Sequence, residues 1–284
     1  MIDIKEDKIF SLNCGGMLLE IDKPKVMGIL NLTPDSFYDG GRYTSEKAVL
    51  AQVEKMLSEG ADMIDVGAVS TKPDAANISL EEESNRLIPA LKAIKKEFPK
   101  SIISIDTFRS EIAKKTIDEG ASIINDIYAG TYDERIFEVV ANNNIPIALM
   151  HIQGTPETMQ KNPVYTNVVT EIFDFFTQRI ALAKKYGVKD ILVDVGFGFG
   201  KTIEHNYQLL KNMDFFSLLG YPLLAGVSRK SMIYKLLETT PQEALNGTTA
   251  VHTIALQNGV NILRVHDVKA AKECIEITEM LKKV

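Results

Sequence analysis

The chain has 284 residues, of which 45% are hydrophobic and 25% charged, and this balance excludes a disordered or collagen-like protein. Its 32 basic and 38 acidic residues give a formal net charge of −6, which argues against a nucleic-acid partner held by bulk charge. No apolar run approaches the roughly 20 residues of a membrane span, and the charged start MIDIKEDK is unlike a secretory signal. We therefore expect a cytoplasmic protein without a membrane partner.

Two alternating apolar stretches, residues 9–14 and 17–21, come first in the chain and flank Gly15-Gly16. Such a pattern predicts a β-hairpin. We expect this hairpin to cover the floor of the structure that follows it.

Eight short runs rich in Val, Ile and Leu follow, and each precedes a stretch long enough for an amphipathic helix. The runs are 26–30, 63–66, 102–105, 122–124, 147–150, 191–193, 223–227 and 262–265. Eight strand–helix units predict a TIM (β/α)8 barrel more readily than an open doubly wound sheet, and no GxGxxG follows the first run. Since no linker or repeat interrupts the pattern, we expect one domain over 1–284, with the hairpin in 1–22 and the barrel in 23–284.

Helix boundaries are marked by capping residues. Ser79 precedes a helix-like segment and stands three residues before the acid Glu82, the pattern of a capping box. That helix should run toward Phe98, because Pro99 blocks its continuation. Helix ends are also expected at Gly60, Gly120 and Gly259.

Polar residues follow every predicted strand, and in TIM barrels these positions form the active site. They are Asn31, Asp65, Asp106, Asn125, Asp126, His151, Asp194, Ser228, Arg229, Lys230, Arg264 and His266. Other roles remain open at this point: Asp65 and Asp126 are equally well explained as helix N-caps, and His151 as a hydrogen-bonded core histidine. Thr107 could be the cap after the third strand and leave the Asp106 carboxylate free.

A local basic cluster is predicted at the last two strands. Arg264 and His266 alternate on one strand, so their side chains point the same way, and Lys230 follows the neighbouring strand. Buried cations need a neutralising anion, for which phosphate or pyrophosphate is a suitable partner.

Two loops at the same end of the barrel contain several glycines. Residues 196–201 (GFGFGK) lack the spacing of a phosphate loop, so we expect backbone with positive φ near a ligand. Residues 31–41 (NLTPDSFYDGG) suit a lid over substrate, although the Phe37-Tyr38 pair could instead pack on the barrel rim.

Seven ordered motifs give the chain its resemblance to a known family. They are MGILNLTPDSFYDGG (27–41), DVGAVSTKP (65–73), SIDT (104–107), IIND (123–126), DVGFGFGK (194–201), SRKSMI (228–233) and RVHDV (264–268). Over nearly its whole length the chain resembles the dihydropteroate synthases of the pterin-binding barrel family. The resemblance implies a transferase of folate biosynthesis that condenses 6-hydroxymethyl-7,8-dihydropterin diphosphate with p-aminobenzoate, requires Mg²⁺ and forms a homodimer.

By motif position, the resemblance also implies roles for individual residues. Asp106, Asn125, Asp194 and Lys230 correspond to the pterin pocket, Arg264 and His266 to groups that hold the diphosphate, and Asn31 to the Mg²⁺ ligand. Phe37, Asp39, Thr71, Pro73 and Ser231 correspond to the two mobile loops and the p-aminobenzoate site. Asp106, Lys230, Arg264 and His266 are the expected catalytic residues. An Asp carboxylate suits the paired donors of a pterin edge, and the cations suit a departing diphosphate.

The second loop departs from the family pattern GGxSTRPGA. Lys72 stands in place of an arginine and Asp74 in place of a glycine, while Val195 replaces the usual proline after Asp194. The first two changes put affinity for p-aminobenzoate and the response to sulfonamides in question. Two other readings remain open, namely a pterin-binding methyltransferase domain and an inactive pterin-binding paralogue.

Overall fold

The computed structural model describes residues 8–32, 42–69, 78–155, 159 and 163–284. Eight parallel strands close into a barrel in the order β10-β3-β4-β5-β6-β7-β8-β9. Their bounds are β3 Lys25–Asn31, β4 Met63–Gly67, β5 Ile103–Asp106, β6 Ile123–Asp126, β7 Ile147–Met150, β8 Ile191–Asp194, β9 Leu223–Ala225 and β10 Ile262–Val265. Pairing of β10 with β3, in register from Ile262 opposite Lys25, closes the cylinder. The predicted TIM barrel is confirmed.

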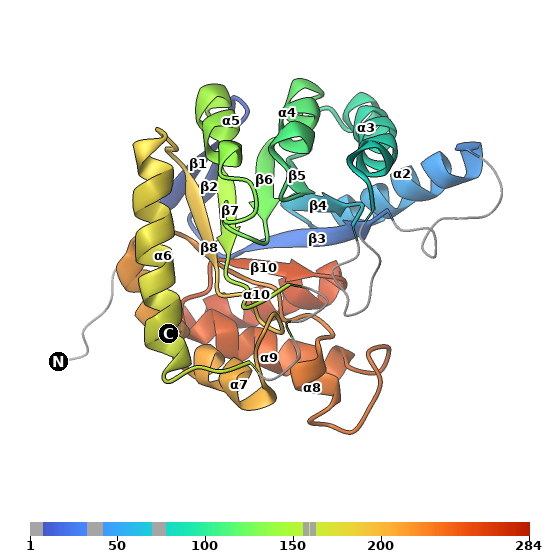
Figure 1. Cartoon of the computed structure of the whole chain (residues 1–284). Coiled ribbons are helices and arrows are strands. Elements are labelled where there is room, and N and C mark those ends of the chain that lie inside the picture. Colours follow the sequence, from blue (N-terminus) through green and yellow to red (C-terminus); the bar gives the residue numbers. More distant parts are fainter. Residues whose placement is uncertain (1–7, 33–41, 70–77, 156–158, 160–162) are drawn as a thin grey trace.

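Helices surround the strands (Figure 1). They are α2 Arg42–Ser58, α3 Leu80–Glu97, α4 Ser110–Asp118, α5 Arg135–Asn143, α6 Val168–Lys185, α7 Ile203–Lys211, α8 Ser231–Tyr234, α9 Leu245–Gln257 and α10 Val268–Lys282, with a 3₁₀ helix at Met213–Leu219. Every barrel strand is followed by a described helix. The segment between β9 and β10 contains two helices, α8 and α9. Within the described ranges, no helix is both long and apolar enough to cross a membrane.

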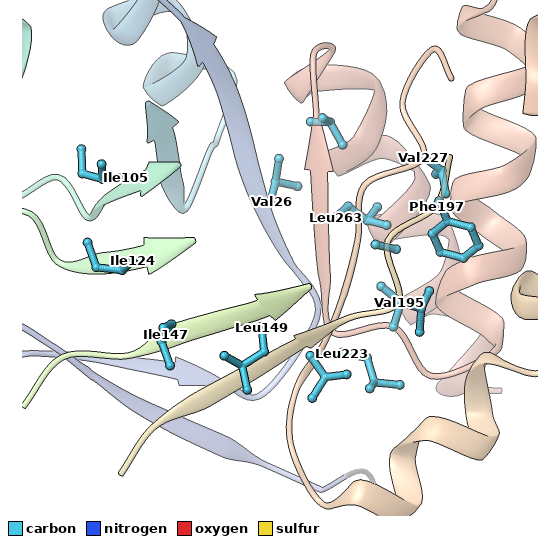
Figure 2. Close-up of a cluster of buried hydrophobic side chains, with 14 of the residues drawn as sticks. Val26, Ile105, Ile124, Ile147, Leu149, Val195, Phe197, Leu223, Val227 and Leu263 are labelled. Carbon is cyan, nitrogen blue, oxygen red and sulfur yellow. The ribbon is translucent and has the colours of Figure 1, made fainter. Parts of the chain in front are cut away.

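The main core lies between the barrel and its helices, because strands buried on both faces place every second side chain outward. Figure 2 shows strand residues of this core, among them Ile124, Ile147 and Leu263, all fully buried. Helix side chains such as Leu87, Ile112 and Phe176 pack in the same core. This packing fixes the strands, and with them the residues at the strand ends.

A second core fills the floor of the barrel. The predicted hairpin is confirmed as β1 Phe10–Cys14 paired with β2 Met17–Ile21. Its inward side chains, Leu12, Cys14, Leu19 and Ile21, pack with residues that point into the barrel from the strands, such as Met27 and Met63. The hairpin therefore covers the amino-terminal end, which leaves the carboxyl ends of the strands as the expected place of the active site.

The predicted helix boundaries hold with one correction. Ser79 caps α3 by accepting a hydrogen bond from the backbone N–H of Glu82, 3.1 Å away. The return bond of a capping box is absent, because the Glu82 carboxylate instead pairs with Arg86. Gly60 and Gly120 have φ near 95°, as expected of residues that end a helix in the left-handed region.

Candidate active site

Asp65 is the central acceptor at the carboxyl end of the barrel. Its carboxylate is fully buried on β4 and accepts hydrogen bonds from Ser104 Oγ at 2.6 Å and from Asn125 Nδ2 at 3.1 Å. Arg264 Nε donates a third bond at 2.7 Å. Three neighbouring parts of the barrel wall are thereby tied to one carboxylate.

Arg264 reaches across the barrel mouth from β10 and joins two acids. Beside its bonds to Asp65, its Nη2 atom donates to Asp106 Oδ2 at 3.0 Å. Burial raises the pKa of Asp106 above its usual value, an effect that the Arg264 charge opposes and the neighbouring Asp65 reinforces. Among the described residues, Nη1 of Arg264 has no hydrogen-bond partner, so one edge of the guanidinium can still bind an anion.

This arrangement corrects the sequence-based view of a basic cluster that needs phosphate for charge balance. Arg264 already has two carboxylate partners within the protein, at Asp65 and Asp106. The basic groups therefore do not require a bound anion to be stable, although they can still attract one.

Asp194 and Lys230 lie on either side of a space left by Gly226. A Cβ atom built on Gly226 would stand 3.8 Å from Lys230 Nζ, 3.9 Å from Asp194 Oδ2 and 4.0 Å from Arg264 Cβ. Burial raises the pKa of Asp194 and lowers that of Lys230 to about 8, and in both cases the charge of the other residue opposes the shift. An acceptor and a donor thus lie together beside a residue that has no side chain.

Lys230 also rests on the glycine-rich segment after β8. Its ammonium donates to the carbonyl of Phe197 and lies 4.6 Å from the centre of the Phe199 ring. Gly196 and Gly198 have φ of 71° and 82°, which confirms the predicted positive-φ backbone of this segment. Asp194 stabilises its start by accepting from the Gly196 N–H at 2.8 Å.

His266 is exposed at the end of β10 and is bound to Ser228. The Ser228 hydroxyl oxygen lies 3.0 Å from His266 Nδ1 and accepts from the His266 backbone N–H at 3.2 Å. The hydroxyl has one hydrogen, which it can donate to Nδ1. The imidazole proton then sits on Nε2, where it can be donated to a ligand.

The structure brings together most of the described residues that the sequence singled out. Asp106, Asn125 and Arg264 share one network, Asp194 and Lys230 lie beside it, and His266 follows Arg264 by two positions. Ser231 begins α8, and Asn31 is exposed at the end of β3. The remaining predicted residues, Phe37, Asp39, Thr71 and Pro73, lie outside the described residues, as do Lys72 and Asp74.

The alternative roles considered for neighbouring residues have clear outcomes. Asp65 is not a helix cap, since it lies within β4 and binds three side chains. Asp126 accepts hydrogen bonds from backbone N–H groups, but these belong to Tyr128 and Gly130 in the turn after β6 rather than to a helix. Thr107 accepts a long bond from the Arg109 N–H and donates to the buried Glu83, while the Asp106 carboxylate is paired rather than free.

Comparison with known proteins assigns the family. Residues 27–266 match the model of the pterin binding enzymes. The chain belongs to the pterin-binding enzyme family. Within this family it is similar to the dihydropteroate synthase of Haemophilus influenzae, with 42% identity over 261 residues that cover 91% of this chain and 94% of the relative.

Solved structures of the same family superpose on this pterin-binding enzyme over almost its full length. Yersinia pestis dihydropteroate synthase, solved with a sulfonamide drug complex, has a TM-score of 0.90 and 39% identity, with 97% of this chain and 100% of that chain covered. The Xanthomonas albilineans enzyme with 4-aminobenzoic acid has a TM-score of 0.90 and 37% identity, covering 98% and 100%. The pterin-binding enzyme described here is accordingly a dihydropteroate synthase, a transferase of folate biosynthesis.

Sequence reasoning missed three contributors to the site of this pterin-binding enzyme. Asp65 was expected among the strand-end residues but was equally well explained as a cap, and its central role beside Ser104 and Asn125 was not predicted. Gly226 was missed because a residue without a side chain leaves space rather than chemistry. Phe199 was not expected beneath Lys230, since the pairing joins residues 31 positions apart.

Proposed function

We propose that this site condenses 6-hydroxymethyl-7,8-dihydropterin diphosphate with p-aminobenzoate, and that the residues described above perform the separate tasks of that reaction. The observation that carries the proposal is the grouping of Asp194, Lys230 and Arg264 around Gly226, with the Arg264 guanidinium held between Asp65 and Asp106. It offers a carboxylate and an ammonium to one flat polar molecule and a guanidinium edge to an anion attached to it.

The site offers hydrogen-bond acceptors to the donors of the pterin ring and a donor to its acceptors. Its amino group and ring N–H are donors, which the free oxygen of Asp194 can accept, because Gly196 occupies the other oxygen. Its ring oxygen and a ring nitrogen are acceptors for the Lys230 ammonium. Asn125 is held by Asp65 through its Nδ2, so its carbonyl oxygen stays available to a pterin donor.

The diphosphate is the leaving group, and its charge grows as the carbon–oxygen bond to the pterin methylene breaks. Arg264 can bind it through Nη1, since Nε and Nη2 are held by Asp65 and Asp106. His266 can donate from Nε2, which the bond between Ser228 and Nδ1 favours as the protonated nitrogen. Donors fixed in place before reaction stabilise developing charge without reorganisation.

The pterin methylene becomes positive in the same step, and Asp106 is the carboxylate placed to stabilise it. The amine of p-aminobenzoate then forms the new carbon–nitrogen bond and releases a proton, so the products are 7,8-dihydropteroate and pyrophosphate. Ser231 is the described residue assigned to the p-aminobenzoate side, together with Thr71, Phe37, Pro73 and Asp39, which lie outside the described residues.

Mg²⁺ is proposed as the cofactor, with Asn31 as its protein ligand. Asn31 is exposed at the end of β3, and its amide oxygen is a donor atom that Mg²⁺ accepts. No cluster of three or more His, Cys, Asp or Glu that could enclose a metal occurs in the described part of the chain. This fits a Mg²⁺ ion bound through one protein ligand together with substrate phosphates and water. Such an ion would neutralise charge on the departing diphosphate.

The deciding experiment measures pyrophosphate release from both substrates in the presence of Mg²⁺. We expect release that depends on p-aminobenzoate and stops when EDTA is added. A reaction without p-aminobenzoate controls for hydrolysis of the diphosphate. Silence in this assay, with pterin binding retained in calorimetry, would indicate a pterin-binding protein without synthase activity and would overturn the proposal.

A homodimer is proposed from the surface of the last two helices. Ile254 on α9 and Ile277, Met280 and Leu281 on α10 are between 43% and 62% exposed, and a second copy of the chain could cover these apolar side chains. These residues fall within the segments 242–257 and 269–281. Light scattering at micromolar concentration should give twice the 31.5 kDa chain mass, and a monomer mass would remove this proposal.

Two further assignments are proposals of the same kind. A cytoplasmic location is supported by Cys14 and Cys274, which are both free and buried, as expected in a reducing compartment. A single domain over 1–284 is supported by the shared core in which the hairpin residues pack against the barrel interior.

A further inference from the structure

Arg229 stands between two site residues, Ser228 and Lys230, in an unusual backbone conformation. Its φ is 55°, in the left-handed region that costs a residue with a Cβ atom free energy. Such a conformation persists only where surrounding contacts hold it. The contacts of Arg229 therefore indicate what this position is for.

Arg229 contacts three other segments of the chain, two through its side chain and one through its backbone. Its Nε and Nη2 atoms donate to the two carboxylate oxygens of Asp267 at 2.8 and 3.0 Å, a bidentate pair. Nη1 donates to the carbonyls of Pro241 and Gln242 at 2.8 and 2.6 Å. The backbone N–H donates to Thr248 Oγ1 on α9 at 3.1 Å.

Four of the five guanidinium N–H groups are thus used within the protein, so these contacts of Arg229 are structural. Its importance lies in the order of the chain. Ser228 immediately precedes Arg229, and His266 immediately precedes Asp267. The Arg229–Asp267 pair therefore runs beside the Ser228–His266 bond and connects the same two loops a second time.

Both Ser228–His266 hydrogen bonds meet at one atom, Ser228 Oγ, and by themselves would leave the two loops free to rotate about that point. Two adjacent cross-links fix both their separation and their relative angle. The imidazole of His266 and the ammonium of Lys230 are carried by these loops, one on each side of the double cross-link. Displacement of a binding group by about 1 Å can reduce a rate by up to ~100-fold.

We propose that Arg229 is a positioning residue that fixes the diphosphate-binding His266 against the loop of Lys230. This inference rests on the proposed function, because it assigns His266 to the diphosphate. It predicts that loss of the Arg229 bridge weakens recognition of the diphosphate more than recognition of p-aminobenzoate or of the pterin ring.

The test is the variant Arg229→Lys, which keeps the charge but loses the paired hydrogen bonds. We expect the KM for the pterin diphosphate and the Kd for inorganic pyrophosphate to rise about tenfold, the ratio that corresponds to loss of one well-placed hydrogen bond. The KM for p-aminobenzoate and the Kd for 6-hydroxymethylpterin, which has no diphosphate, should change less than about twofold.

Two further variants keep the inference testable if Arg229→Lys folds poorly. Asp267→Asn removes the charge from the other end of the bridge, and the double variant should be no worse than the more damaging single variant if both act through one contact. Arg229→Gly relieves the left-handed backbone but lacks the side chain. It should show the same selective loss of pyrophosphate affinity at a thermal stability closer to that of the unchanged protein.

The matched control is Arg135→Lys, which loses the same kind of fork. Arg135 donates to both oxygens of Asp133 at 2.9 and 3.1 Å, but it lies on α5, outside the site, with its side chain 70% exposed. We expect all four binding and kinetic constants to stay within about twofold. Equal losses toward all ligands in Arg229→Lys, or a fall in melting temperature with unchanged pyrophosphate affinity, would overturn the inference. If the proposed function itself were wrong, the unchanged protein would already fail to release pyrophosphate.

Discussion

The side-chain nitrogen of Lys201 lies 3.1 Å from Nδ1 of His151, and both side chains are buried. Lys201 also donates to the carbonyls of His151 and Phe199, at 3.2 and 2.9 Å. Burial holds the pKa of the Lys201 amine well below its usual value and lowers that of His151 to about 2. The imidazole is therefore a neutral acceptor, and Lys201 ties the end of β7 to the segment that supports Lys230.

Replacing Lys201 with Met tests this connection. The variant Lys201→Met has similar shape but leaves the carbonyls of His151 and Phe199 without their donor. An unsatisfied buried polar group costs about 1–3 kcal/mol, so we expect the free energy of unfolding in urea to fall by about that amount. A stability equal to that of the unchanged protein would show that water or rearrangement replaces the bonds and that the connection contributes nothing.

The barrel could be predicted from the sequence because its signal is repeated and local. Each run of Val, Ile and Leu is followed by a helix-length segment, and the polar residue after each run marks the catalytic end. Knowledge of strand order alone then places Asp106, Asn125, Asp194, Lys230 and Arg264 around one opening.

The pairing of those residues could not be predicted in the same way. Arg264 binds Asp65 across 199 positions of sequence, and nothing in either segment indicates that the guanidinium is neutralised inside the protein. The partners of Lys201 and Arg229 were equally hidden, because both depend on the paths of loops. Loop paths follow from packing among several segments rather than from the local pattern of residues.

Asp65 should be the most costly single residue of the network to change. Asp65→Asn removes the charge that faces Arg264 and places an amide where three donors converge. Removing one partner from a buried ion pair typically costs about 3–5 kcal/mol, and we expect a loss of unfolding free energy of that size together with loss of synthase activity.

A surface ion pair provides the comparison for Asp65. Lys114 pairs with Asp118 on the outside of α4, where both side chains are about half exposed. Lys114→Met should change the free energy of unfolding by no more than about 0.5 kcal/mol. If Asp65→Asn were as mild as this control, the buried network would not be a structural element of the site.

His252 on α9 predicts how stability depends on pH. Its side chain is 1% exposed, and within the described residues neither ring nitrogen has a hydrogen-bond partner. Burial lowers its pKa from 6.5 to about 4, so below pH 6.5 the unfolded chain takes up a proton that the folded protein does not. The resulting loss of stability accumulates as the pH falls from 6.5 toward 4 and reaches about 2 kcal/mol at pH 5.

The variant His252→Phe isolates this contribution. It removes two unsatisfied nitrogens and the titrating group, so we expect it to be less sensitive to acid than the unchanged protein. Urea denaturation at pH 8 and pH 5 gives the free energy of unfolding of both proteins. The advantage of His252→Phe over the unchanged protein should be about 2 kcal/mol larger at pH 5 than at pH 8. His151 is present in both proteins, so its contribution to the pH dependence cancels when their unfolding free energies are subtracted. A difference that is the same at both pH values would contradict the assignment to His252.

Asp194 is expected to dominate pterin recognition, because its Oδ2 atom lies beside Gly226, near the Lys230 ammonium, while its Oδ1 atom holds Gly196. Asp194→Ala should abolish measurable pterin binding in calorimetry with the fold intact, since each hydrogen bond to a charged partner contributes about 1.5–3 kcal/mol and the pterin offers two donors. Asp126→Asn is the matched control: Asp126 is also a fully buried strand-end carboxylate, but its hydrogen bonds within the described residues go to the backbone of its own turn. Its variant should retain pterin affinity within about twofold. Near-normal affinity in Asp194→Ala, or equal loss in both variants, would place the pterin elsewhere.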